Sequence, residues 1–302
     1  MGIILQTNNL TKIYKDKKVV DNLNMTINEG DIYGFVGENG AGKTTLIRLV
    51  TKVILPTSGT FSVLPSHNRY YGDVSAIVET PSLNTNMSAY DNLYNQFILI
   101  NRRDYENIND ILKSVGLDDV INDPKKVGKF SLGMKQRLAV AMSIAGNPKF
   151  LVLDEPMNGL DPEGIVGLRN LIIKLNKEQH ITFLISSHIL DELAKVATRF
   201  GFIHKGKIVK ELTSTELHAS NNKRVCFTLS DVSTVKDIFS KLNINNYVIN
   251  DKDKIVTITG DIVINDIMKA LVNNDITVIK MENIDESIED YYLKLIGGNR
   301  NV

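Results

Sequence analysis

The segment from residue 37 to residue 44 combines glycines with a lysine and a hydroxyl residue in the spacing of a phosphate-binding loop. It consists of Gly37, Glu38, Asn39, Gly40, Ala41, Gly42, Lys43 and Thr44. This run fits the pattern G-x-x-x-x-G-K-[ST], in which glycines let backbone N–H groups surround phosphate oxygens at a helix N-terminus. We expect Lys43 to neutralise the β- and γ-phosphates, the Thr44 hydroxyl to bind Mg²⁺, and Thr45 to belong to the same nucleotide site.

Two adjacent carboxylates follow a second apolar run. Residues 150–153 are Phe-Leu-Val-Leu, and Asp154 and Glu155 come directly after them. In a parallel sheet the carboxyl end of such a strand lies near the phosphate loop, where Asp154 would hold Mg²⁺ and Glu155 would polarise water as a general base. Two carboxylates at a strand end are, alone, more often a solvated turn. The phosphate loop in the same chain favours the catalytic interpretation.

Residues 131–137, Ser-Leu-Gly-Met-Lys-Gln-Arg, begin a predicted helix with a capping serine. A Ser-x-Gly helix start is ordinary by itself, but here it lies between a phosphate loop and an Asp-Glu strand. In that position it resembles, with departures, the L-S-G-G-Q signature of the ABC transporter ATPases. The resemblance covers about residues 3 to 215. It implies that Ser131, Gly133 and Gln136 contact the ATP bound to a second subunit.

The same resemblance implies roles for residues elsewhere in the chain. Tyr14 corresponds to the aromatic residue that stacks on adenine, although a tyrosine in a strand is alone more often a surface residue. His188, which follows the apolar run 181–187, corresponds to the switch histidine that touches the γ-phosphate. Asp161, in Asn-Gly-Leu-Asp, corresponds to the D-loop that links two nucleotide sites. Lys43, Glu155 and His188 are therefore the catalytic residues that we expect.

Glu79 stands where most ABC ATPases carry the glutamine of the Q-loop, within Ala-Ile-Val-Glu-Thr-Pro at residues 76–81. A carboxylate there would bind Mg²⁺ more firmly than the neutral amide and would alter hydrolysis and its coupling. Together with residues 131–137, this substitution resembles the ATPases of bacitracin-resistance and lantibiotic self-protection exporters. Residues 287–293, Ser-Ile-Glu-Asp-Tyr-Tyr-Leu, resemble the S-L-E-D-x-F-L ending of the same exporter group.

Alternating strands and helices must position these side chains. We predict strands at 32–36, 150–153 and 181–187, and helices at 44–53, 91–100, 105–115 and 133–145. Continuous apolar strands that alternate with helices indicate an α/β fold with a parallel sheet covered on both faces. The predicted ATPase domain spans residues 1–217. It has the sheet core of a P-loop NTPase and a helical insert at about 82–148.

Residues 224–302 are predicted to form a separate accessory domain after a polar linker at 220–223. Their order β-α-β-β-α-β, with one more helix at 287–296, matches a small α+β ferredoxin-like unit. We find no phosphate loop, metal-ligand spacing or nucleophile constellation in this part of the sequence. Packing or support of a dimer, and regulation of the ATPase, are both open roles for it.

The overall composition excludes several classes of protein. The 302 residues contain 35 Lys+Arg and 35 Asp+Glu, so no global field would attract nucleic acid. The single cysteine, Cys226, forms no internal disulfide, which agrees with a reducing cytosol. No segment approaches the roughly 20 apolar residues of a membrane span, and the N-terminus lacks the pattern of a signal peptide.

The expected function is that of an ATPase coupled to transport. The ABC resemblance implies ATP and Mg²⁺ as ligands, a head-to-tail homo- or heterodimer of ATPase subunits, and a separate transmembrane permease. We expect the protein to be peripheral at the cytoplasmic face of the membrane and to energise export of antimicrobial peptides. Lipid or drug export, uptake, and a role in translation or DNA maintenance are the alternatives, although no nucleic-acid partner is expected.

Overall fold

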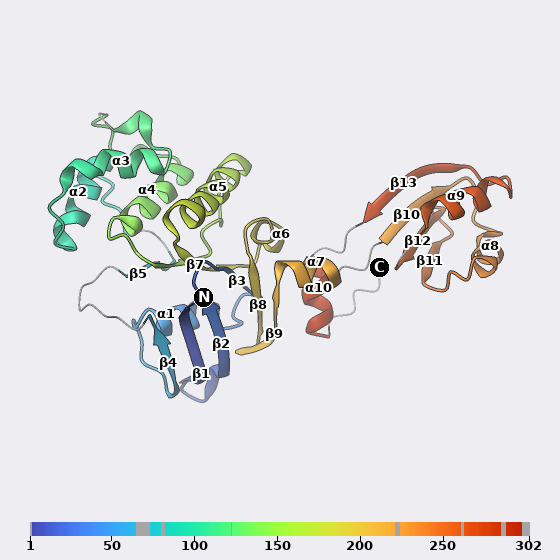
Figure 1. The fold of residues 1–302 in the computed structure, drawn as a ribbon, viewed down its shortest axis with the longest axis horizontal. Helices are drawn as coiled ribbons and strands as arrows, with labels where there is room; N and C mark the ends of the chain where they lie inside the picture. Colours follow the sequence, from blue (N-terminus) through green and yellow to red (C-terminus); the bar gives the residue numbers. More distant parts are fainter. Residues whose placement is uncertain are drawn as a thin grey trace. The chain divides into compact units, whose positions relative to one another are not determined.

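The computed structural model describes residues 2–64, 73–79, 82–121, 123–220, 224–260, 263–284 and 288–297 (Figure 1). The chain forms two compact units. The first contains Met1–Ser214 together with Tyr292–Val302, and the second contains Thr215–Tyr291. Within the described residues, no helix combines the length and the apolar character needed to cross a membrane.

A six-stranded sheet forms the centre of the first unit, in the order β5-β6-β7-β3-β8-β9. Its strands are β3 (Ile32–Val36), β5 (Val74–Ile77), β6 (Phe150–Asp154), β7 (Thr182–Ser187), β8 (Arg199–His204) and β9 (Lys207–Thr213). All neighbouring strands are parallel except β8 and β9. Strands β3, β6 and β7 are buried along their whole length, as their continuous apolar sequences require. The predicted α/β sheet core is confirmed.

The register of the central strands brings functional segments together. Asp154 at the end of β6 pairs with Ser186 of β7, and Val36 at the end of β3 pairs with Ser187. Because these strands are parallel, the chain leaves all of them at the same edge of the sheet. The segments that follow β3, β6 and β7 therefore meet there.

Helix α1 (Lys43–Val50) packs between the central sheet and a second, three-stranded antiparallel sheet. That sheet consists of β1 (Ile3–Tyr14), β2 (Lys17–Asn28) and β4 (Ser58–Val63), in the order β2-β1-β4. The apolar side chains of α1 form one core cluster with both sheets, including Leu5 of β1 and Val152 of β6. Burial on two sides fixes the helix that begins directly after the phosphate loop.

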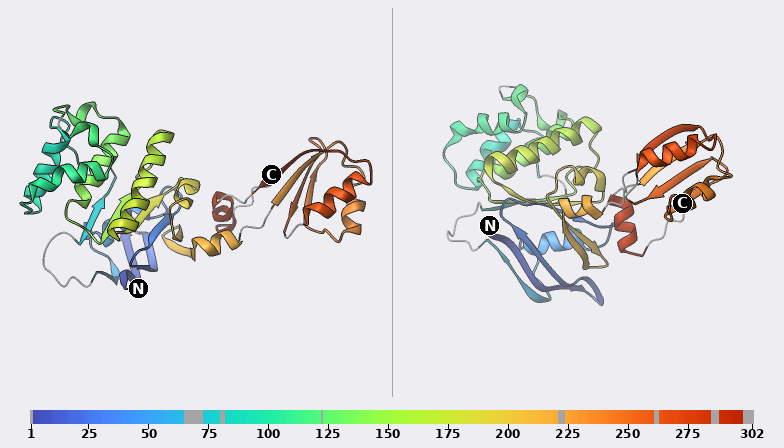
Figure 2. Two further views of the ribbon diagram at one scale, coloured as in Figure 1. Left: turned by 45° about the horizontal axis from the view of Figure 1, so that its top comes forward. Right: turned by 45° about the vertical axis from the view of Figure 1, so that its right-hand side comes forward.

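The helical insert contains α2 (Ala89–Leu99), α3 (Ile108–Ser114) and α4 (Leu132–Ile144), which lie together in both views of Figure 2. A capping box opens α2: Ser88 Oγ accepts from Asp91 N at 3.1 Å, and the Asp91 carboxylate accepts from Ser88 N at 3.3 Å. Arg102 binds both the Asp104 carboxylate and the Ala145 carbonyl, which joins the end of α2 to the end of α4. This guanidinium holds the pKa of the Asp104 carboxyl well below its usual range.

The first unit also contains α5 (Pro162–Gln179), α6 (Leu190–Ala194) and the 3-10 turns Tyr105–Asn107, Asp118–Val120 and Val127–Lys129. Helix α7 (Ser214–Ser220) begins at the last residue of this segment of the first unit and continues into the second. Buried Tyr33 of β3 donates a 2.6 Å hydrogen bond to Glu211 of β9, across β8. Glycine is required at Gly201 of β8, because a Cβ atom there would lie 2.1 Å from the Tyr33 hydroxyl. Burial raises the pKa of that hydroxyl well above its usual value, so it remains a donor.

The second unit contains a four-stranded antiparallel sheet in the order β11-β12-β10-β13. Its elements are β10 (Arg224–Leu229), α8 (Val235–Lys241), β11 (Tyr247–Asn250), β12 (Ile255–Thr259), α9 (Ile264–Val272) and β13 (Val278–Ile284). The hairpin β11-β12 places β12 beside β10, which gives the split β-α-β arrangement of a ferredoxin-like unit. Both helices contribute to its core, through Phe239 of α8 and Leu271 of α9.

The last helix, α10 (Ile288–Leu295), differs from the predicted domain division. The sequence prediction assigned all of residues 224–302 to the C-terminal domain, whereas the residues from Tyr292 onward belong to the first compact unit. The reason is the Tyr292 side chain, which is 4% exposed and stacks on Phe202 of β8. An amphipathic helix pattern does not identify the surface on which such a residue packs.

Candidate functional site

The phosphate loop connects β3 to α1 and is supported from outside. Gly40 and Gly42 have φ angles of 81° and 112°, which glycine adopts without a steric penalty. A Cβ atom at Gly42 would lie 2.5 Å from the Val19 carbonyl oxygen of β2. The carbonyl of Ala41 accepts a 2.9 Å hydrogen bond from Gly206 N in the β8–β9 turn. The loop is therefore held by two neighbouring segments.

The predicted phosphate-site residues differ in exposure along the loop. The tip residues Glu38, Asn39 and Gly40 are exposed, Gly37, Ala41, Gly42 and Lys43 are buried, and Thr44 and Thr45 are partly buried. Lys43 is 6% exposed, and its ammonium donates to the Gly37 carbonyl at 2.6 Å and the Glu38 carbonyl at 3.3 Å. The same Nζ atom lies 3.2 Å from Oε1 of Glu155. The loop lysine and the expected base are thus in direct contact.

Glu155 lies at the centre of the predicted catalytic residues. Its Oε2 atom is 2.7 Å from His188 Nδ1 and accepts a 3.2 Å hydrogen bond from His188 N. Lys43, Glu155 and His188, which are far apart in the sequence, are therefore brought together. Glu155 has a φ angle of 49°, an unusual left-handed conformation that is typical of functional positions.

Ser186 connects the two carboxylates, a role that was not predicted. Its Oγ donates to Asp154 Oδ1 at 2.5 Å and accepts from Glu155 N at 2.9 Å. Asp154 is 3% exposed, so this hydrogen bond helps to satisfy a buried carboxylate. Two serines before a histidine at a strand end are the sequence feature that would have pointed to it.

The three residues predicted to bind Mg²⁺, Thr44, Asp154 and Glu79, all offer oxygen donors. Such a set fits Mg²⁺, which binds proteins through one or two carboxylates together with waters and substrate phosphates. No group of three or more His, Cys, Asp or Glu that could hold a metal by itself occurs among the described residues. The carboxylate of Glu79 is bound by the guanidinium of Arg48 in α1. Arg48 is a partner that the sequence did not reveal.

The predicted adenine-stacking residue, Tyr14, is at the end of β1 and 44% exposed. The ammonium of Lys12 lies 5.1 Å from the centroid of its ring, a cation–π contact. The exposed ring is available to a base, but no described contact joins it to the phosphate loop. Its role in nucleotide binding stays a prediction.

The residues expected to face a second subunit differ in their exposure. Ser131 caps α4 by accepting from Met134 N at 3.2 Å, and it is exposed. Gly133 is partly buried, and Asp161 caps α5 by accepting from Gly164 N at 3.0 Å. Gln136 is only 7% exposed, because it lies on the inner face of α4. Contact between Gln136 and a nucleotide on a partner stays a prediction.

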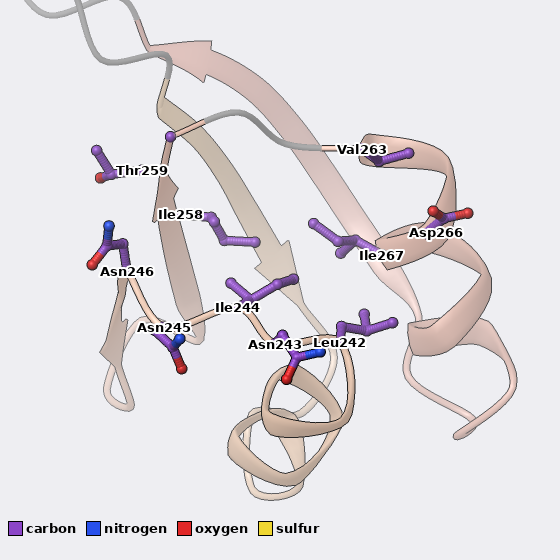
Figure 3. Close-up of a pocket in the computed structure, with 11 residues that line it drawn as sticks. Leu242, Asn243, Ile244, Asn245, Asn246, Ile258, Thr259, Val263, Asp266 and Ile267 are labelled. Carbon is purple, nitrogen blue, oxygen red and sulfur yellow. The ribbon is translucent and has the colours of Figure 1, made fainter.

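The second unit holds a cavity of about 400 Å³ between α8, β12 and α9. Ile244, Ile258 and Ile267 point into it, while Asn246 and Asp266 lie at its rim (Figure 3). Both rim residues are exposed. This cavity combines apolar walls with solvated polar groups and has no catalytic arrangement like that around Glu155.

A buried strand, a glycine loop that cradles a lysine, and two carboxylates at the end of the neighbouring strand define a P-loop nucleoside triphosphatase. The comparisons with known proteins give the particular family. A family model described as "ABC transporter" matches residues 20–158. The bacitracin transport ATP-binding protein BcrA of Bacillus licheniformis is 40% identical over 99% of both chains.

A second relative and a solved structure are also similar to this chain, the structure in its fold. The lantibiotic transport ATP-binding protein SrtF of Streptococcus pyogenes is 41% identical over 69% of this chain and 90% of that protein. The solved ADP conformation of MJ1267, an ATP-binding cassette of an ABC transporter, has a TM-score of 0.65 and 24% identity, covering 72% of this chain and 93% of that one. The chain belongs to the ATP-binding proteins of ABC transporters, and it is an ATPase subunit.

Proposed function

We propose that this chain hydrolyses ATP to drive export of antimicrobial peptides of the bacitracin or lantibiotic type through a separate transmembrane permease. The observation that carries the proposal is the similarity to a bacitracin transport ATP-binding protein over 99% of both chains. It includes the C-terminal unit as well as the ATPase unit. Partnership with a permease implies a peripheral position at the cytoplasmic face of the membrane.

In this proposal Glu155 is the general base of hydrolysis. Its two carboxylate oxygens contact Lys43 at 3.2 Å and His188 at 2.7 Å, so the side chain is held in one orientation. A base must be positioned in this way before it can accept the proton of an attacking water. His188 positions the carboxylate and offers its exposed ring to the γ-phosphate. Lys43 transfers its donors from the loop carbonyls to phosphate oxygens when ATP binds.

Thr44 and Asp154 are proposed to hold Mg²⁺, with Glu79 as a further oxygen donor. The ion supplies positive charge against the β- and γ-phosphates. Ser186 keeps the Asp154 carboxylate oriented through its 2.5 Å hydrogen bond. Electrostatic positioning of this kind provides most of the catalysis in phosphoryl transfer.

Hydrolysis is proposed to require two ATPase subunits arranged head to tail. The nucleotide held by Lys43 and Glu155 of one subunit would be covered by the α4 N-terminus of the other. That N-terminus is suited to an anion, because Ser131 is exposed and the first turn of α4 presents backbone N–H groups. One structural neighbour, an ATP-binding cassette with ADP and Pi, is itself described as dimeric.

Expression of the chain with its membrane partner tests this function. Cells that carry both proteins should survive bacitracin or a lantibiotic better than cells that carry the permease alone, and the two proteins should co-purify. A control chain with Glu155→Gln should co-purify but give no protection. Protection against a drug or a lipid stress, without protection against peptides, would support ATP-driven export and reject the peptide substrate.

Replacing Glu79 by glutamine should raise the Mg²⁺ concentration needed for half-maximal hydrolysis. Glutamine has a similar reach but no charge, so attraction for the ion falls while the geometry is nearly kept. For an exposed charge we expect an increase of about two- to fivefold. Hydrolysis rates measured over a Mg²⁺ titration, and repeated with Mn²⁺, give this value.

Arg48→Ala is the variant that complements Glu79→Gln in the Mg²⁺ titration. Since Arg48 binds the Glu79 carboxylate, its removal should free that charge and shift the Mg²⁺ dependence in the opposite direction. Superimposable titrations for wild type, Glu79→Gln and Glu79→Ala would show that Glu79 has no part in metal binding.

A further inference from the structure

The hydroxyl of Tyr292 lies against the phosphate loop. It accepts a hydrogen bond from the backbone N–H of Glu38 at 3.3 Å and donates one to the backbone carbonyl of Ile203 at 3.2 Å. Tyr292 is 4% exposed, and Ile203 is completely buried. One buried hydroxyl thus uses both its donor and its acceptor to connect the end of β8 to the second residue of the loop.

The peptide bond between Gly37 and Glu38 is consequently held from two sides. Its C=O group, that of Gly37, accepts from Lys43 Nζ at 2.6 Å, and its N–H group, that of Glu38, donates to Tyr292. The C=O and N–H of a trans peptide point in opposite directions. Lys43 and Tyr292 therefore bind opposite edges of one peptide plane. The tyrosine hydroxyl fixes the orientation of the carbonyl that holds the loop lysine.

Close packing beneath the loop also restrains the Gly37–Glu38 peptide. A Cβ atom at Gly37 would lie 2.6 Å from the Ile203 carbonyl oxygen, so the loop backbone runs directly over the group that Tyr292 also binds. Hydrogen bonds that run in series polarise and strengthen one another in a buried environment. Here the series runs from Lys43 through the Gly37–Glu38 peptide and Tyr292 to Ile203.

The ring of Tyr292 is held separately from its hydroxyl. It stacks on Phe202, with centroids 6.2 Å apart and planes at 21°. Phenylalanine would keep this stacking and lose both hydrogen bonds, and the S-L-E-D-x-F-L ending that the chain resembles has phenylalanine at this position. Burial raises the pKa of the Tyr292 hydroxyl above its usual value, so the group stays protonated and donates to Ile203 at neutral pH.

We propose that Tyr292 is a positioning residue for ATP binding, whose hydroxyl orients the Gly37–Glu38 peptide so that Lys43 is ready to meet the phosphates. Tyr292 acts through this peptide and does not touch the nucleotide. The role rests on the proposed ATP site at residues 37–44. It assigns to the last helix of the chain a function in the affinity for ATP.

The test compares the full chain with Tyr292→Phe. ATP affinity, measured by titration with a fluorescent ATP analogue, should fall about fivefold, as expected for loss of a buried hydrogen bond. KM for ATP should rise to a similar extent while kcat changes little, because Glu155 and His188 are untouched. The thermal unfolding midpoint should fall only slightly, because two hydrogen bonds are lost while the ring stacking is retained. Tyr247→Phe in β11, whose ring packs against Phe239, is the matched control and should leave affinity unchanged.

Amide hydrogen exchange tests whether the Tyr292 hydroxyl protects the Glu38 amide, whereas a rise in KM without a change in kcat separates a positioning role from a purely structural one. The Glu38 amide should exchange slowly in the wild type and much faster in Tyr292→Phe. Wild-type ATP affinity in Tyr292→Phe would overturn the proposal, whatever the exchange rate of the Glu38 amide. The wild type replaces Tyr292→Phe in the test if the variant does not fold. Rapid exchange of the Glu38 amide in the wild-type protein would then overturn the proposal, because it would show that the amide is not held by Tyr292. Failure of the wild type itself to bind ATP would instead refute the proposed ATP site.

Discussion

Replacing Glu155 by glutamine is expected to stop ATP turnover while ATP binding persists. Loss of a general base costs about 10²- to 10⁴-fold in rate. Glutamine keeps the size of the side chain, so the phosphate loop and Asp154 are undisturbed. It also removes the negative charge that now faces Lys43 at 3.2 Å, which leaves the lysine free for phosphate oxygens. Binding should therefore be equal to or tighter than that of the wild type.

A stable dimer in Mg-ATP should accompany this loss of turnover, because two subunits that cannot hydrolyse ATP cannot separate through hydrolysis. Size-exclusion chromatography with and without Mg-ATP measures the dimer, and a phosphate-release assay measures the turnover. Glu178→Gln is the control, since Glu178 is an exposed residue near the end of α5. Hydrolysis by Glu155→Gln at the wild-type rate would remove Glu155 from the role of base.

The sequence predicts which segments meet at the carboxyl edge of the sheet, because parallel strands constrain their positions. Once 32–36, 150–153 and 181–187 are recognised as neighbouring buried strands, the residues that follow them must emerge at one edge. The proximity of Glu155 to Lys43 and His188 follows from that rule, and the structure shows that their side chains are in contact. The strand bounds in the structure differ from the predicted ones by at most one residue at each end.

Contacts between side chains of distant segments could not be predicted in the same way. The pairing of Arg48 with Glu79 depends on how the segment after β5 turns, and Glu79 has a φ angle of 62° that no residue pattern indicates. The hydrogen bond between Glu38 and Tyr292 spans 254 residues of sequence. Periodicity shows that α10 has an apolar face, but several surfaces could have received it.

Replacing Lys43 by alanine is expected to abolish measurable ATP binding, which is a different defect from that of Glu155→Gln. The Lys43 ammonium is 6% exposed and held by two loop carbonyls, so it is a buried charge aimed along the phosphate loop. Charged hydrogen bonds to phosphate oxygens are individually strong, and their joint loss should weaken ATP binding on the order of 100-fold or more. The same change leaves the Glu155 carboxylate without its cationic partner, which adds repulsion against the incoming phosphates.

Titration with a fluorescent ATP analogue measures this loss, with Lys177→Ala on the exposed face of α5 as the control. The double variant Lys43→Ala/Glu155→Gln separates the two contributions. Removal of the unpaired carboxylate should restore part of the affinity, because only the repulsive term is relieved, and no ATP-dependent dimer should form. If Lys43→Ala binds ATP as well as the wild type does, the phosphate loop is not the nucleotide site. If the double variant regains full affinity, Lys43 serves mainly to neutralise Glu155, and the attraction for phosphate must come from the backbone N–H groups of the loop.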